Sequence, residues 1–179
     1  MYLPGHLAMG YLVAAGPALA TRRALDVRYA VVPALIGAVS PDFIDKPLNY
    51  FDIVSTSRTA GHSIFTILLL IALWHWLKRA KKAIARPYGW WLVGIGTHLF
   101  IDLVNDVFRG FEARGHLFTT WITWPLTDAN TAQIQFDIGK HIRLHPSFTS
   151  LEISVFALTL VVAIASRFYG AKPGGVDGV

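Results

Sequence analysis

His98 and Asp102 are the residues whose types and spacing most directly suggest chemistry. They lie four positions apart in the run GTHLFID (residues 96–102), which contains no other ionisable residue. Residues at i and i+4 share one face of a helix, so an imidazole and a carboxylate there could grip one ion. Ionisable groups inside an apolar helix are costly, and they usually pair, coordinate an ion or line a polar cavity. The pair therefore predicts either a metal site or a self-satisfied His–Asp contact between helices.

Four more candidate ligands stand at the ends of other apolar segments. Asp42 and Asp45 are three positions apart and face the same way if their turn is helical. Histidines combined with carboxylates suit zinc, with manganese or iron as alternatives, whereas carboxylates alone would suit magnesium or calcium. The chain has no cysteine, so thiolate ligands and cysteine nucleophiles are excluded. We predict a divalent metal site, most readily for zinc, formed by His6, Asp42, Asp45, His62, His98 and Asp102.

Each of these candidates also has a plainer interpretation. His6 fits an interfacial histidine, and His62 fits the cap of a helix that starts after it. Asp42 follows a proline, as in a turn that ends a helix. Arg58 could bind a phosphate through its bidentate fork or anchor a lipid headgroup. The residues whose role stays open are His116, His141, His145, Asp128 and Asp137.

Composition indicates that these residues are positioned by membrane helices. Hydrophobic residues make up 54% of the 179 residues and charged ones only 15%, against about 25% in an ordinary soluble domain. So short a chain could not hide that much apolar surface inside a water-soluble globule. We therefore predict an all-α integral membrane bundle with four or five apolar helices and a long outer loop. The apolar segments run over residues 7–20, 29–40, 64–76, 90–104 and 151–168.

The whole of residues 1–170 is expected to form one membrane-embedded domain, with a disordered, glycine-rich tail over 171–179. The net charge is +5, and half of the 16 basic residues fall in two short loops between apolar segments, at 22–28 and 78–86. That placement favours an anionic membrane surface over nucleic acid as partner.

The same two basic loops predict the orientation of the chain. If every segment spans, both loops lie on one side, which the positive-inside rule makes cytoplasmic. The N-terminus and the loops at 41–61 and 105–149 then face outward. All six candidate ligands fall on that non-cytoplasmic face, whereas His75 falls on the other side and is interpreted as an interfacial residue.

The ordered motifs resemble those of the LexA-binding, inner-membrane-associated metal-dependent hydrolases (the YdjM-type family). The resemblance covers residues 1–106 and rests on an N-terminal His6, the PDFID run at 41–45, the RTAGHS run at 58–63, and His98 with Asp102. Three departures are visible. The Pro-Asp motif has one extra residue before its second Asp, Ser57 replaces a family histidine, and Gly61 replaces a threonine. If the family histidine at the position of Ser57 binds metal or substrate, this chain either lacks that ligand or replaces it with another histidine, such as His116.

The family is held to be distantly similar to zinc-dependent phospholipases C and P1-type nucleases, which implies phosphoester hydrolysis. On this hypothesis the protein is a multi-pass inner-membrane enzyme that acts on a lipid or lipid-linked phosphoester. Asp45 or Asp106 would serve as general base and Arg58 would steady the phosphate. Two alternatives remain open. The cluster could be a structural metal or polar network in a non-catalytic protein, or it could mark an ion path in a transporter.

Overall fold

The computed structural model describes residues 3–21, 24–54, 56–110, 122–126 and 150–169. Within these ranges all regular structure is helical, which confirms the all-α prediction. The long helices are α1 (Leu3–Ala20), α2 (Val32–Tyr50), α3 (Ile64–Arg79), α4 (Ala85–Gly110) and α6 (Ser150–Tyr169). Two short elements complete them, a π-helical turn η1 (Val27–Val31) that leads into α2, and a 3-10 turn η2 (Ala60–His62) that precedes α3.

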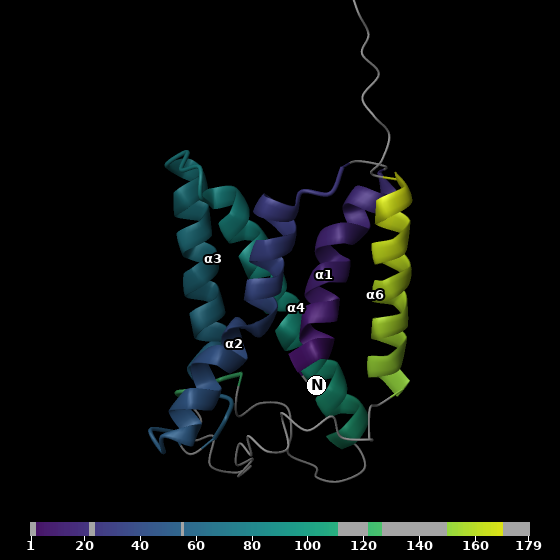
Figure 1. Cartoon of the computed structure of the whole chain (residues 1–179). Coiled ribbons are helices and arrows are strands. Elements are labelled where there is room, and N and C mark those ends of the chain that lie inside the picture. Colours follow the sequence, from purple (N-terminus) through teal and green to yellow (C-terminus); the bar gives the residue numbers. More distant parts are fainter. Residues whose placement is uncertain (1–2, 22–23, 55, 111–121, 127–149, 170–179) are drawn as a thin grey trace, which may run out of the picture.

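The five long helices run alternately up and down (Figure 1). The α1–α2 and α3–α4 connections, which carry the basic residues, lie at one end of the bundle. The start of α1, the end of α2 and the end of α4 lie at the other end. Four of the expected apolar segments lie within α1, α3, α4 and α6. The chain therefore places the N-terminal His6 and the end of α2 on the same side of the bundle.

Helix α2 extends well beyond the apolar segment expected at 29–40, and the alternative interpretation of Pro41 as a turn that ends the helix is wrong. The helix continues through both Pro41 and Pro47 to Tyr50, so the expected loop at 41–61 shrinks to the residues after Tyr50. Proline removes one backbone hydrogen bond, but helices packed against neighbours tolerate that loss when nearby groups satisfy the backbone. Since residues 42–45 are helical, Asp42 and Asp45 do face the same side of α2, and both are buried.

Small residues let α2 and α4 approach closely. A Cβ added at Gly94 would lie 2.1 Å from the carbonyl oxygen of Ala34, and one at Gly37 would lie 2.0 Å from that of Trp91. Ala34 and Ala38 on α2 are completely buried. Such small-residue crossings are typical of helices that associate in membranes. The crossing brings α4 so near to α2 that His98, one turn after Gly94, reaches the α2 backbone.

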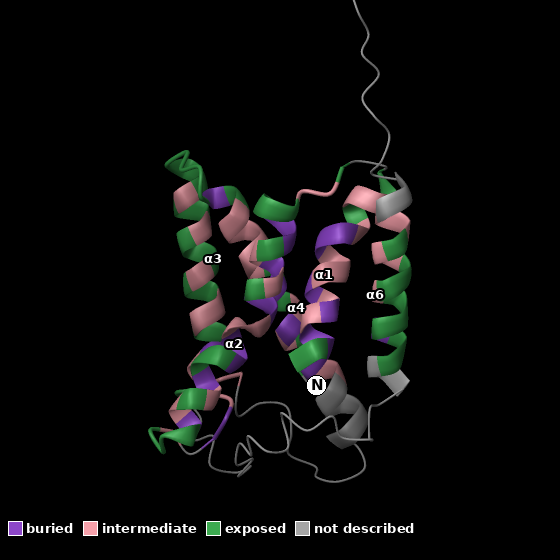
Figure 2. Ribbon diagram, in the orientation of Figure 1, coloured by how far each residue is buried: buried purple, intermediate pink, exposed green. Residues whose placement is uncertain are grey.

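The outer surface of the bundle is apolar. Helix α3 has no buried residue, although most of its side chains are hydrophobic. Leu69 is 69% exposed, and Leu160 and Val161 on α6 are similarly exposed. Figure 2 shows the buried residues gathered between α1, α2 and α4, while α3 and α6 carry exposed residues along their lengths. Large exposed apolar faces of this kind mark contact with lipid or with another protein.

Among the described helices, one is long and apolar enough by itself to cross a bilayer, the continuous helix Val27–Tyr50 formed by η1 and α2. The number of membrane-crossing helices, expected to be four or five, stays a prediction. The single domain over 1–170 also stays a prediction, and the tail at 171–179 lies outside the described residues.

Candidate metal centre

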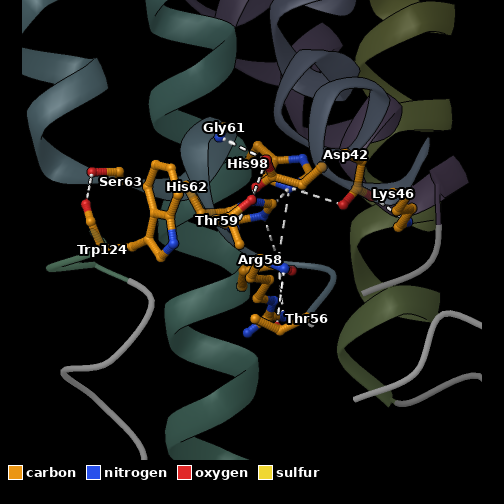
Figure 3. A network of polar contacts seen from close by, with 12 residues as sticks. Asp42, Lys46, Thr56, Arg58, Thr59, Gly61, His62, Ser63, His98 and Trp124 are labelled. Atoms are coloured by element: carbon orange, nitrogen blue, oxygen red, sulfur yellow. Dashed lines mark hydrogen bonds and ion pairs between the residues drawn. The ribbon is translucent and has the colours of Figure 1, made fainter. Parts of the chain in front are cut away.

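The structure brings the six predicted ligands together from four chain segments. His6 comes from the first turns of α1, two carboxylates from α2, one imidazole from η2, and the last pair from α4. Each of the three imidazoles is 1% exposed. The contacts among them form one connected network, part of which Figure 3 shows. The residues in this cluster are His6, Asp42, Asp45, His62, His98 and Asp102.

Two of the imidazoles direct ring nitrogens at each other. His98 Nδ1 donates to the carbonyl oxygen of Ala38 at 2.7 Å. His62 Nδ1 donates to Oδ2 of Asp45 at 2.8 Å. These bonds place the proton of each neutral ring on Nδ1, which leaves a bare lone pair on each Nε2. The two Nε2 atoms lie 3.2 Å apart, so a cation between them, either a proton or a metal ion, is needed to relieve the repulsion.

A carboxylate oxygen completes a triangle with these nitrogens. Oδ2 of Asp102 lies 3.6 Å from His62 Nε2 and 3.7 Å from His98 Nε2. Ligand atoms at about 2.05 Å from a tetrahedral zinc ion are separated by roughly 3.3 Å. The three observed separations are close to that value. Oδ1 of Asp42 also lies 3.7 Å from His98 Nε2. The residues present therefore fit a divalent metal ion.

His6 packs against the face of the His98 ring. Its ring stacks on that of His98 with centroids 3.9 Å apart, and its Nε2 lies 3.4 Å from Oδ1 of Asp102. Among the described residues its buried Nδ1 has no hydrogen-bond partner. Two groups, His6–His98–Asp102 and Asp42–His62–His98, each have ligand atoms within 4.8 Å of one another. Both groups need His98, whose only available nitrogen is Nε2, so the two groups cannot each hold a separate ion.

Asp45 does not have the role expected of it, which was that of a metal ligand or a general base. Its Oδ1 accepts hydrogen bonds from Thr59 Oγ1 and the backbone N–H of Gly61, and its Oδ2 from the N–H of Thr59 and from His62 Nδ1. Four such bonds fill the positions that a carboxylate offers. Asp45 belongs to neither candidate ligand group. It orients His62, as carboxylates behind metal-binding histidines commonly do.

Two cationic side chains stand at the edge of the cluster. An Arg58 guanidinium nitrogen lies 2.9 Å from Oδ2 of Asp102, and Lys46 Nζ pairs with Oδ2 of Asp42. Their side chains are 17% and 16% exposed, more than any of the ligands they touch. Sequence reasoning missed Lys46, although its i+4 spacing from Asp42 was a visible signal. It also missed Thr59, for which no sequence pattern exists.

Other predicted residues lie apart from the cluster or outside the described ranges. His75 is exposed on α3, where its Nδ1 lies 3.0 Å from the carbonyl oxygen of Ile71. Asp106 falls on α4, one turn after Asp102, but its side chain lies outside the described residues. Ser57, at the position of the family histidine, is buried. The candidates that fall outside the described residues are His116, Asp128, Asp137, His141 and His145.

The environment of His62 predicts how metal binding depends on pH. Burial lowers the pKa of His62, but hydrogen bonds with Asp102 and Asp45 outweigh that effect and leave the pKa above its ordinary value. Protons and metal compete for His62 Nε2. Zinc affinity is therefore expected to fall as the pH drops through this raised pKa, by about tenfold for each pH unit below it. Chelator-competition titrations at a series of pH values measure this, and a constant affinity between about pH 8 and 5 would exclude His62 as a ligand.

Comparison with known proteins adds one match. The sequence model of a family described as YdjM inner membrane protein matches residues 1–173. No curated protein and no solved structure matches the chain. The match extends beyond the motifs at residues 1–106 to nearly the whole chain.

Proposed function

The chain belongs to the YdjM inner membrane protein family, and from that premise we propose that it is a metal-dependent hydrolase of phosphoesters. The observation that carries the proposal is the buried triangle of His62 Nε2, His98 Nε2 and Asp102 Oδ2, with sides of 3.2, 3.6 and 3.7 Å. Zinc is the first candidate ion, with manganese and iron as alternatives. The proposal also draws on the distant similarity to zinc-dependent phospholipases C and P1-type nucleases that is held for the family, which would imply the same reaction class.

Three protein ligands are the usual number in a catalytic zinc site, where a fourth position stays open to water. A bound divalent ion would lower the pKa of that water and polarise a phosphoryl oxygen. Asp42 is best placed to accept the proton, since its Oδ1 lies 3.7 Å from His98 Nε2 beside the triangle. Asp45 is assigned to holding His62, because its four hydrogen bonds leave it no position for a proton.

Arg58 and Lys46 are the groups proposed to draw the phosphate to the cluster. Both touch a candidate carboxylate, and both are more exposed than the ligands. Arginine binds phosphate through paired N–H groups and lysine binds it as a compact charge. Together they would offset the negative charge of a phosphoester beside Asp42 and Asp102.

The proposed substrate is a lipid or lipid-linked phosphoester, which could enter from the bilayer. The support is the apolar outer surface of α3 and α6. We further propose a multi-pass arrangement with the basic α1–α2 and α3–α4 connections in the cytoplasm. The cluster, which includes the start of α1 and the turn before α3, would then lie on the non-cytoplasmic side.

A structural metal site in a non-catalytic protein is the second candidate. It is favoured by the burial of the ligands, of which His62, His98 and Asp102 are at most 3% exposed. A metal held by residues of η2 and α4 would also tie these segments together.

Hydrolysis assays on the purified full chain separate these two functions. Zinc-loaded protein in mixed micelles is expected to release phosphate or a phosphorylated headgroup from phosphatidic acid or phosphatidylglycerol, or to cleave bis(p-nitrophenyl) phosphate. Asp42→Asn is expected to lower the rate by about 100-fold or more while metal stays bound, as for loss of a general base. The matched control is Asp52→Asn, an exposed position on the α2–η2 connection. Zinc-loaded protein that cleaves none of these phosphoesters would leave the structural candidate in place.

A further inference from the structure

A second candidate site lies between α3 and α4, and none of the six residues of the His–Asp cluster lines it. A groove of about 840 Å³ opens there. On α3 it is lined by Ile67, Ile71, Trp74 and Lys78, which recur every three or four residues along one helix face. On α4 it is lined by Gly89, Val93 and Gly96, among others. Helix α3 packs on α4 far less extensively than α2 does, which leaves this space between them.

The groove is apolar along its walls and basic at its mouth. Three lysines (Lys78, Lys81 and Lys82) and Arg86 line its mouth near the α3–α4 connection. Arg86 pairs with Asp26. Within the part of the chain that the structure describes, none of the three lysines pairs with a carboxylate, and Lys78 Nζ lies 4.5 Å from the centre of the Trp74 ring. The mouth therefore carries positive charge that a ligand with a negative group would balance.

The length of the groove matches one leaflet of a bilayer. From Lys78 to Ile67 the α3 axis spans about 16 Å at a rise of about 1.5 Å per residue. Half of a hydrocarbon core about 30 Å thick is roughly the same length. Trp74 lies near the mouth, as tryptophans do at membrane interfaces, and its Nε1 donates to the carbonyl oxygen of Ala85 at 3.0 Å.

We propose that this groove binds one anionic phospholipid, with its acyl chain along α3 and α4 and its phosphate among Lys78, Lys81 and Lys82. Basic pockets between membrane helices recognise anionic headgroups in this way. The lipid would come from the leaflet at the basic end of the bundle. The site is separate from the metal cluster, and it does not depend on whether the cluster is catalytic.

Native mass spectrometry of the full chain, released from micelles that contain equal amounts of phosphatidylglycerol and phosphatidylcholine, tests the headgroup site. Wild type is expected to retain one phosphatidylglycerol in preference to phosphatidylcholine. The Lys81→Gln/Lys82→Gln variant is expected to bind it about fivefold more weakly for each lysine removed. Arg79→Gln is the matched control, because Arg79 is an exposed cation of the same region that does not line the groove.

A second pair of variants tests the apolar walls. A Cβ added at Gly96 would meet no atom within 4 Å, so Gly96→Leu is expected to fill the groove without a clash and to displace the lipid. Gly16→Leu, also in open space, is the control. Metal content should stay unchanged in all four variants. Equal retention of the two lipids by wild type, full phosphatidylglycerol binding by either groove variant, or displacement of the lipid by inorganic phosphate alone would overturn the proposal.

Discussion

Replacing His98 with alanine is expected to abolish metal binding, because both candidate ligand groups need its Nε2. His62 cannot take its place, since His62 already contributes its own Nε2 and is held by Asp45. Loss of an outer-shell partner usually weakens a metal site by about 10- to 100-fold. Loss of His98, the shared ligand, should weaken zinc binding by more than this 10- to 100-fold range. Zinc titration of the purified protein against a competing chelator measures the change in dissociation constant.

His75→Ala is the matched control for this variant. It also removes one imidazole, from an exposed position on α3 where the ring contacts only its own helix in the described structure. Its zinc affinity should equal that of wild type. If His98→Ala binds zinc as tightly as His75→Ala does, then the cluster is not where the metal binds.

Asp45→Asn is expected to destabilise the fold by roughly 3 kcal/mol. The carboxylate accepts a backbone N–H on each oxygen, from Thr59 on one and from Gly61 on the other. Whichever oxygen the amide nitrogen replaces, the N–H groups of the amide then face a buried backbone N–H that has lost its acceptor. The change should appear as a lower midpoint of thermal or denaturant unfolding in detergent micelles, with Asp52→Asn as the exposed control.

The same variant separates orientation of His62 from direct ligation by Asp45. If Asp45 only positions His62, the Asp45→Asn change should lower metal affinity by about 10- to 100-fold. The visible absorption spectrum of the cobalt-substituted protein should nevertheless keep its wild-type shape, because the ligand atoms are the same. A changed cobalt spectrum at full occupancy would assign Asp45 to the metal itself.

The helical character of the chain and its family could be predicted from sequence, because each rests on a local signal. Apolar runs separated by basic loops predict membrane helices. The motifs at residues 1–106 predicted the family, and the family match over residues 1–173 confirms that prediction. The spacing of His98 and Asp102 suggested a shared helix face, and both residues lie on α4. The two basic connections do lie at one end of the bundle (Figure 1).

The features that escaped prediction depend on tertiary contacts. Proline usually ends a helix, and nothing local reveals that α2 continues through Pro41 to Tyr50. The role of Asp45 depends on the backbone of residues 59–61, which folds back against α2. A Cβ at Gly61 would lie 2.6 Å from the carbonyl oxygen of Pro41. This close approach explains why the position suits glycine. The family motif, which has threonine there, gave no reason to expect it.

The metal content of the purified full chain tests the central claim most directly. Wild type and a His62→Ala/His98→Ala variant would be purified in detergent, incubated with zinc and manganese, desalted and measured by inductively coupled plasma mass spectrometry. Stoichiometric zinc, manganese or iron in wild type that is lost from the variant is the predicted result. No bound metal in wild type, or the same content in both proteins, would contradict a metal centre at this cluster and make it a polar network that holds the helices together.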